Sequence, residues 1–489
     1  CGMVLDVRSD VATLTSSLGQ RQALRSQGTA SSLSNRTASE PLLPGTASAG
    51  TASAGGQAAS GGNCAGLRGI LLSPWCILLV CFPVGIVSAA LEWGDSYTFW
   101  LMFFAMLPLA KILGDATEEL AANLNNDMIS GLLNATFGPV SKSSSERPGG
   151  RQYSDSMEAA MQGKAGSIAS VETTNGGNAV ELIMTIAFLR NHEYLVVKQT
   201  LIGSVLSNML LVLGMSFFAG GLAKGTDGEC VTKGKEQRYN TLGALMNTSM
   251  LLLSCFALCL VTVFNYVDDI NDKEEPVKEA RDYMLPISRG VSFALVVCYC
   301  AFIAFQLVTH SESLKDSAEG EEAEAEEATL SLSCAVLLLL GATLVVSAAS
   351  EYLTEALEGA LKSCSLSKAF VGVILLPIVG NACEHAAAIR FAIQDRAGLS
   401  VGIAVGSSVQ IALFVAPVSV LLGWAIGDSA EGFNMDLDFG ELDVVVLTLS
   451  VIIILAIVVD GKSNWLQGYA LMTAYFIAAV LYWNMPLET

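Results

Sequence analysis

Charged residues are scarce in this chain of 489 residues. Asp, Glu, Lys and Arg together make up 15% of it, whereas hydrophobic residues make up 52% and the mean hydropathy is +0.53. Such a composition is too apolar for a soluble protein of this length. The sequence therefore argues against a soluble domain and predicts an integral membrane protein.

Basic residues are the scarcer of the two charge types. The chain has 26 Lys and Arg against 46 Asp and Glu, which gives a formal net charge of −20. A nucleic-acid partner requires a surface rich in Lys and Arg, so this balance argues against one. Cations are the natural partners of so acidic a chain.

Groups of cysteine and histidine with zinc-ligand spacing are also missing. Most of the twelve cysteines lie inside apolar segments, which favours small core residues over a disulfide framework or a zinc site. We therefore expect no bound cofactor. The N-terminal region likewise lacks the compact apolar core of a secretory signal.

Long apolar stretches are what the sequence does have. About ten of them approach the roughly 20 residues with which a helix crosses a hydrocarbon core of about 30 Å. Their continuous apolarity favours helices over a β-barrel. We expect an all-α, polytopic protein embedded in a lipid bilayer, with about 11 transmembrane helices near residues 69–91, 98–123, 176–190, 196–220, 240–266, 287–308, 329–352, 366–394, 399–426, 441–460 and 464–485.

The polar segments divide the chain into parts. Residues 1–66 are rich in Ser, Ala, Gly and Thr, which predicts a disordered tail, and their excess of arginine favours the cytoplasmic side. The predicted parts are this tail, a first transmembrane helix within 67–95, a first repeat at 96–310 with a polar insert at 139–177, an acidic linker at 311–328, and a second repeat at 329–489.

The two halves carry the same motif. Residues 177–181 read GNAVE and residues 380–384 read GNACE, and each places a carboxylate in an apolar segment. A polar cluster begins 22 positions after each glutamate, GSVLSN from Gly203 and GSSVQI from Gly406. Without the first helix, each half has five spans, with the motif in the second and the cluster in the third. An odd number of spans gives the halves opposite orientations, which is the inverted-repeat plan of many transporters.

The motif and the cluster together supply oxygen atoms. Polar residues three positions apart share one face of a helix, so four helices can direct oxygens to one place. Gly and Asn before each glutamate weaken the helix and expose backbone carbonyls. Carboxylate, amide and carbonyl oxygens are the ligands that a hard divalent cation such as Ca²⁺ prefers. The residues concerned are Glu181, Glu384, Asn178, Asn381, Ser204, Ser207, Ser407 and Gln410.

A carboxylate inside a membrane is functional by default, although each of the two glutamates could also be a structural acid bonded to backbone amides. Burial and mutual repulsion favour the protonated form of such a pair, which titrates as a coupled unit. Metal ions and protons would then compete for one site. Since the empty, doubly charged state is costly to move across the membrane, this competition is the mechanism of an exchanger.

These residues resemble the vacuolar cation/proton exchangers of the calcium/cation antiporter superfamily. The resemblance covers roughly residues 69–485 and includes Ser-Asn in the first polar cluster and His directly after the second glutamate, which are typical of the proton-coupled branch. The stretches that carry it are GDATEELA (114–121), GLLNATFG (131–138), GNAVELI (177–183), GSVLSNMLLVLG (203–214), SEYLTEALEG (350–359), GNACEHAAAIRFA (380–392) and GSSVQIALFVAPV (406–418). In the family, GLLNATFG would run straight into NAVELI, without the insert.

The resemblance implies that Glu181 and Glu384 are the cation and proton ligands. It also implies that the acidic linker is cytosolic and modulates transport, although its glutamates match no EF-hand spacing and could be a solvated charged segment. The residues that would line the site are Asn178, Asn381, Ser204, Ser207, Asn208, Ser407 and Gln410. His385 could take part in proton transfer or pack as a neutral imidazole. Glu118, Glu119, Glu351 and Glu355 could form a cation access path or face lipid headgroups.

The sequence thus predicts a transporter and not an enzyme. The function we expect is exchange of cytosolic Ca²⁺, with Mn²⁺ and other divalent cations left open, for protons across a vacuolar or other acidic-organelle membrane. The alternatives are a sodium-coupled calcium exchanger of the same fold, an ion channel, and a non-transporting sensor or scaffold in which the insert has abolished transport.

Overall fold

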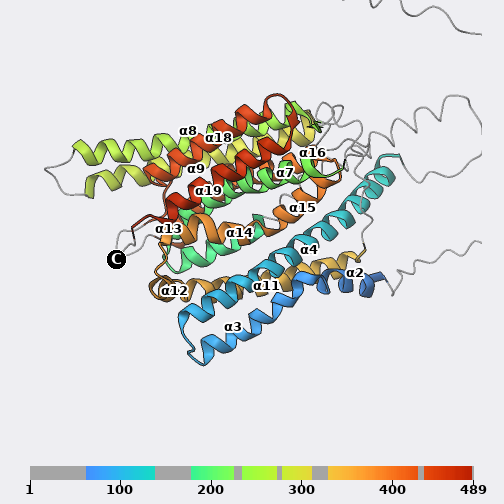
Figure 1. The fold of residues 1–489 in the computed structure, drawn as a ribbon, viewed down its shortest axis with the longest axis horizontal. Helices are drawn as coiled ribbons and strands as arrows, with labels where there is room; N and C mark the ends of the chain where they lie inside the picture. Colours follow the sequence, from blue (N-terminus) through green and yellow to red (C-terminus); the bar gives the residue numbers. More distant parts are fainter. Residues whose placement is uncertain are drawn as a thin grey trace, which may run out of the picture. The chain divides into compact units, whose positions relative to one another are not determined.

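Helices account for almost all of the residues in the computed structural model, which describes residues 62–137, 178–224, 234–271, 278–310, 329–427 and 434–486 (Figure 1). These described residues all belong to one compact unit. The predicted disordered tail up to residue 61, the insert 139–177 and the acidic linker 311–328 lie outside them.

The first half begins earlier than we expected, because a helix starts inside the predicted tail. A 3₁₀ segment that starts at Pro74 then leads into α3, so the first span is not one regular helix. The elements are α2 (Gly62–Leu71), η1 (Pro74–Val80), α3 (Cys81–Ala90), α4 (Asp95–Phe137), a helix over 178–190, α6 (Tyr194–Leu206), η2 (Ser207–Val212), α7 (Leu213–Leu222), β1 (Gln237–Arg238), α8 (Thr241–Asn271), α9 (Lys278–Ala304) and η4 (Phe305–Thr309).

The long helices of the second half follow in the same order as those of the first, but the strand of the second half comes between its last two helices, whereas β1 comes before α8. This strand, β2, pairs antiparallel with β1 of the first half. The elements are α11 (Leu332–Glu355), α12 (Leu357–Cys364), α13 (Lys368–Phe370), η6 (Val371–Leu375), α14 (Leu376–Gly380), α15 (Ala382–Ile393), α16 (Ala397–Gln410), η7 (Ile411–Val415), α17 (Ala416–Ile426), α18 (Glu441–Val458), β2 (Lys462–Ser463) and α19 (Trp465–Trp483).

The described residues account for some, but not all, of the eleven membrane spans that we expected. Within the described ranges, eight helices are long and apolar enough to cross a membrane, and a ninth is added if α12 and α13–α14, bent by 115°, form one span. Two expected spans, the first and the third, are not among these helices, and the reason differs between them. The first span reaches the required apolarity only over Cys76–Ala90, and the third is described only from residue 178.

Helices of one half pack against helices of the other. The long helices α4 and α11 lie side by side, and so do α8 and α18 (Figure 1). A further contact is also repeated in both halves, since α7 packs on α19 and its counterpart α17 packs on α9. This exchange of partners agrees with the two related five-helix repeats that the motifs predict.

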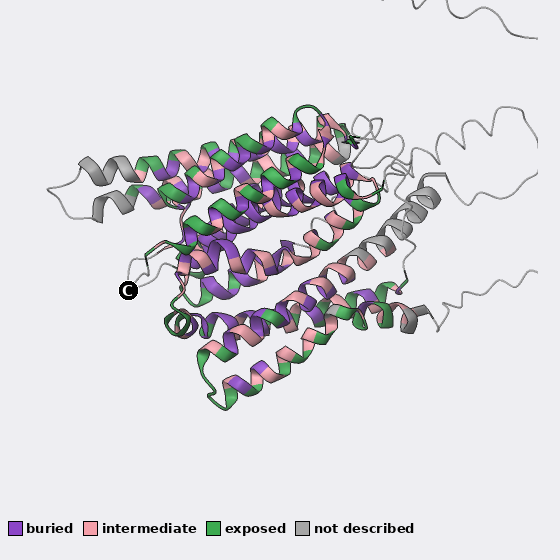
Figure 2. Cartoon of the chain, viewed as in Figure 1, coloured by how far each residue is buried: buried purple, intermediate pink, exposed green. Residues whose placement is uncertain are grey.

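Large apolar side chains cover much of the outside of the helix bundle. On α8, for example, Phe256 is 60% exposed and Leu260 is 55% exposed, whereas the small and polar residues of the motifs are buried inside (Figure 2). An exposed apolar surface of this extent fits lipid and not water. The protein is therefore an integral membrane protein.

The eighth span is interrupted at the motif, as its glycine, asparagine and proline predict. Helix α14 ends at Gly380, Asn381 has a non-helical backbone (φ −85°, ψ 17°), and α15 starts at Ala382. Such a break in a spanning helix is tolerated only where the backbone is buried in protein or lines a cavity. Here it places Glu384 in the first turn of α15.

Candidate cation-binding site

The two repeated motifs meet inside the bundle. Glu181 on the helix at 178–190 is 1% exposed and Glu384 on α15 is 2% exposed. A methyl group built on Gly380 would lie only 2.7 Å from Oε1 of Glu181, so the first carboxylate rests directly on the backbone of the second motif. The two carboxylates are also close enough to repel each other electrostatically.

Among the described residues, no other residue donates a hydrogen bond to either carboxylate. All four oxygens of Glu181 and Glu384 are buried and without a partner, and so are Oδ1 of Asn381, Oδ1 of Asn208 and Oγ of Ser204. A buried carboxylate that lacks donors or a counter-charge is strongly unfavourable. The arrangement therefore suits a positively charged occupant, either a metal ion or protons on the carboxylates.

Each asparagine is held by the polar cluster of the opposite half. Nδ2 of Asn381 donates to the backbone oxygen of Ser204 at 3.0 Å, and Nδ2 of Asn178 donates to the backbone oxygen of Ser407 at 3.4 Å. The two serines occupy equivalent positions after their glutamates, so the two hydrogen bonds are repeated by the internal symmetry. The amide groups are thereby tied to the neighbouring helices.

Further hydrogen bonds make the first asparagine more constrained than the second. Asn178 donates from Nδ2 to Oε1 of Gln410 at 2.8 Å and accepts from Oγ of Ser407 at 2.8 Å. Oγ of Ser407 in turn accepts from Nδ2 of Asn208 at 3.0 Å. Side chains from three helical segments are therefore linked around the motif of the first half.

A glycine allows two helical segments of the site to cross closely. A methyl group on Gly203 would lie 2.3 Å from the backbone oxygen of Val373, so only glycine allows α6 to approach η6 this closely. A π-helical turn also begins within each polar cluster, η2 at Ser207 and η7 at Ile411. Sequence reasoning missed these turns, which have no composition signal of their own and often mark functional sites.

His385 does not contact the carboxylates through any described hydrogen bond. Its Nδ1 lies 2.6 Å from the backbone oxygen of Asn381, one turn earlier in the same segment, and its Nε2 is buried without a partner. The neighbouring Cys383 donates from Sγ to the backbone oxygen of Ala110 at 2.9 Å, which brings α4 against the second motif.

The acidic residues near the helix ends do not lie beside the two buried carboxylates. The side chain of Glu118 is outside the described residues, whereas Glu119 accepts hydrogen bonds from the backbone N–H groups of Thr329 at 3.0 Å and Leu330 at 2.9 Å. At the other end of α11, Glu351 is partly exposed and pairs with Arg190 at 3.6 Å, and Glu355 is exposed. Glu119 thus caps the chain just before α11.

The atoms that could bind a cation at this site are oxygens. Among the side chains that the structure describes, no group of three or more His, Cys, Asp or Glu is assembled for a metal ion. The motifs instead combine two carboxylates with amide and hydroxyl groups, which suits a hard cation that keeps part of its oxygen shell from neutral ligands.

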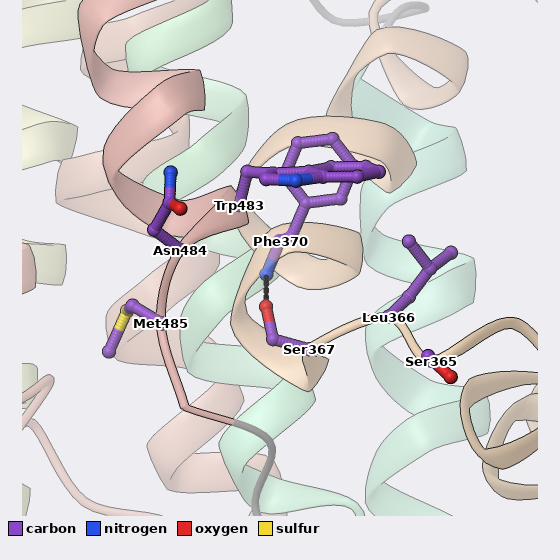
Figure 3. Close-up of a pocket in the computed structure, with 7 residues that line it drawn as sticks. All are labelled: Ser365, Leu366, Ser367, Phe370, Trp483, Asn484 and Met485. Atoms are coloured by element: carbon purple, nitrogen blue, oxygen red, sulfur yellow. Dashed lines mark hydrogen bonds between the residues drawn. The ribbon is translucent and has the colours of Figure 1, made fainter.

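A surface pocket lies away from these residues, at the ends of α13 and α19 (Figure 3). Within it, Oγ of Ser367 accepts a hydrogen bond from the backbone N–H of Phe370 at 3.1 Å and so caps the start of α13. Its lining residues are Ser365, Leu366, Ser367, Phe370, Trp483, Asn484 and Met485.

Comparison with known proteins reveals extensive similarity. The family described as "Sodium/calcium exchanger protein" matches residues 166–308 and 334–484. The chain is 34% identical to vacuolar cation/proton exchanger 1 of Arabidopsis thaliana, over 84% of this chain and 78% of the relative. It is 35% identical to a Ca²⁺/H⁺ antiporter of Synechocystis sp., over 84% of this chain and 97% of the relative.

Solved structures are similar as well. The structure of native YfkE matches with a TM-score of 0.59 and 28% identity, over 84% of this chain and 100% of the other. A second structure of that protein is described as a Ca²⁺/H⁺ antiporter. The crystal structure of the H⁺/Ca²⁺ exchanger CAX matches with a TM-score of 0.50 and 13% identity, over 86% of this chain and 92% of the other, which shows a shared fold.

Proposed function

This chain belongs to the sodium/calcium exchanger protein family, and from that premise we propose that it is a proton-coupled cation antiporter. It exchanges cytosolic Ca²⁺ for protons across the membrane of a vacuole or another acidic organelle. Relatives named vacuolar cation/proton exchanger and Ca²⁺/H⁺ antiporter, each more than 30% identical over most of the chain, support this assignment.

The observation that carries the proposal is the pair of buried carboxylates without hydrogen-bond donors. Glu181 and Glu384 together bring two negative charges into a site where no other described residue donates a hydrogen bond to them. One divalent cation or two protons neutralise that charge, whereas one monovalent cation leaves half of it. The site therefore favours exchange of one Ca²⁺ for two protons.

The same charge balance explains why the two fluxes are coupled. The empty site keeps both charges buried, and moving uncompensated charge through a low-dielectric membrane is costly. The protein consequently changes its accessible side only when the site is filled. The inverted halves, which exchange helix partners across the bundle, supply two related arrangements between which such a protein alternates.

The free energies of the calcium and proton gradients balance at this stoichiometry. A thousandfold gradient of Ca²⁺ corresponds to about 4 kcal/mol, and each proton that moves down one pH unit supplies about 1.4 kcal/mol. Two protons that move down about 1.5 pH units therefore balance the calcium gradient. The exchange is electrically neutral, so the membrane potential neither helps nor opposes it.

The test is calcium uptake by the purified full-length chain in phosphatidylcholine vesicles with an acidic interior. We expect uptake by the wild type, and a loss of about 100-fold or more in Glu181→Gln and Glu384→Gln because each amide cannot release or take up a proton. Asp443→Asn is the matched control, since Asp443 is also buried but bonds Tyr482 at 2.6 Å away from the motifs. It should retain uptake.

Three outcomes contradict the proposal. Normal uptake in Glu384→Gln would remove the role of the carboxylate pair. Uptake driven by a sodium gradient and not by the pH gradient would favour the sodium-coupled alternative. A calcium conductance without counter-transport of protons would indicate a channel.

A further inference from the structure

Helix α6 carries buried polar side chains outside the motif and its polar cluster. Gln199 and Thr200 lie between the start of the helix at Tyr194 and the site residue Ser204, and both are 4% exposed. Oε1 of Gln199, Oγ1 of Thr200 and Oγ of Ser204 are all buried and have no hydrogen-bond partner in the part of the chain that the structure describes. Three unpaired oxygens on one and a half turns of a helix are unusual, because buried polar groups are nearly always bonded.

The three oxygens lie between the site and one end of the bundle, but not on a single face of α6, because Gln199 is one turn before Gly203 on the face that packs against η6. Thr200 is one turn before Ser204, about 6 Å along the helix axis, and both therefore share a face. The start of α6 lies at the end of the bundle where Glu193 pairs with Lys368 at 2.8 Å, which is opposite to the end where α11 begins. The row of oxygens thus leads from the site toward the side away from the predicted cytosolic linker.

The path that a cation would take along these oxygens is closed in this structure. A methyl group on Gly372 would lie 2.8 Å from Oε1 of Gln199, and one on Gly203 would lie 2.3 Å from the backbone oxygen of Val373. Helix α6 is therefore packed closely against η6 at Gln199 and at Gly203. Separation of these two segments would be needed before a cation could pass.

The second repeat has no such row. Glu181 and Glu384 are 203 positions apart, and the same interval places Gly402 and Ile403 of α16 opposite Gln199 and Thr200. Neither counterpart has a side-chain oxygen. The polar residues on α6 are thus not a requirement of the repeated fold, and they distinguish one side of the protein from the other.

We propose that Gln199 and Thr200, together with Ser204, form a second, weak binding station through which the divalent cation leaves the carboxylate site on the acidic side of the membrane. This inference rests on the proposed direction of transport. Neutral amide and hydroxyl oxygens replace part of the water shell of a hard cation without holding it tightly. A station without a carboxylate therefore lowers the barrier to release and does not trap the ion.

The experiment uses the full chain in phosphatidylcholine vesicles with an acidic interior and measures calcium uptake in Gln199→Leu and Thr200→Val. Loss of one oxygen contact corresponds to about a threefold to tenfold change in rate, and we expect that fall in the maximal rate of each variant. The calcium concentration at half-maximal binding in detergent should stay unchanged. The melting temperature should not fall, because removal of an unpaired buried polar group is not destabilising.

Thr262→Val is the matched control. Thr262 on α8 is equally buried, at 4% exposure, and its Oγ1 is also without a partner, but it lies outside α6 and the motifs. It should transport at the wild-type rate. Wild-type rates in both α6 variants, or an equal fall in the Thr262 variant, would overturn the second station.

Two further results separate the inference from the proposed function. A shift in half-maximal calcium binding in the α6 variants would assign both residues to the central site and overturn a separate station. A wild-type chain that takes up no calcium would overturn the proposed function and the inference together.

Discussion

Gly380 is the residue on which the carboxylate of Glu181 rests, so it offers a direct test of how the site is built. A methyl group at this position would lie 2.7 Å from Oε1 and 3.3 Å from the Cδ of Glu181. Carbon and oxygen that are not bonded prefer a separation nearer 3.5 Å. Gly380→Ala therefore has to displace the carboxylate by several tenths of an ångström.

The backbone itself would accept alanine. Gly380 is the last residue of α14 and is not among the residues with positive φ, so on propensity alone alanine in place of a helical glycine stabilises by about 0.5–1 kcal/mol. Against this stands an overpacking cost of about 1–3 kcal/mol that falls on the ligand. We expect the half-maximal calcium concentration of Gly380→Ala to rise about fivefold or more, while the melting temperature changes little.

The assay is calcium uptake as a function of calcium concentration, combined with thermal unfolding in detergent. Gly402→Ala is the control, because a methyl group on this glycine of α16 has nothing within 4 Å. It should transport normally and be as stable as the wild type or more so. A Gly380→Ala variant with wild-type calcium dependence would refute the contact between the two motifs.

Two further predictions concern packing and hydrogen bonding. Lys235 has a side chain that is 2% exposed and pairs with Asp395 at 3.0 Å. Because Asp395 is 23% exposed and keeps a hydrogen bond from Gln237, Lys235→Met should cost about 1–3 kcal/mol of stability in thermal or denaturant unfolding. Lys362→Met, from an exposed pair, should cost less than about 1 kcal/mol. Ser407→Ala removes the hydroxyl that bonds two asparagine side chains and should lower calcium affinity about tenfold in a binding assay. The hydroxyl of Ser419 bonds only the backbone of its own helix, so Ser419→Ala should leave the affinity unchanged.

The comparison between sequence and structure is clearest at the glutamates near the helix ends. Glu119 and Glu351 look alike in sequence, as acids close to the end of an apolar stretch. In the structure one caps the backbone before α11 and the other forms a partly exposed pair with Arg190. These roles depend on which segment lies beside each side chain, and a local pattern carries no such information.

The sequence by itself determined that the chain crosses a membrane, that its halves are related, and that each half buries one glutamate with an asparagine three positions before it. These properties follow from the length of apolar stretches and from the cost of a charge in lipid, both of which are local. The break at Asn381 is local as well, since glycine and proline beside it weaken the helix.

Only the tertiary structure decided how the two halves meet. Glu181 rests on Gly380, and each asparagine bonds the backbone of a serine in the opposite half, Ser204 or Ser407. These contacts join residues more than 170 positions apart, and they depend on helix crossings that glycine makes closer than any side chain would allow. Because crossing distance and helix rotation are set by the packing of the whole bundle, no stretch of sequence specifies them alone.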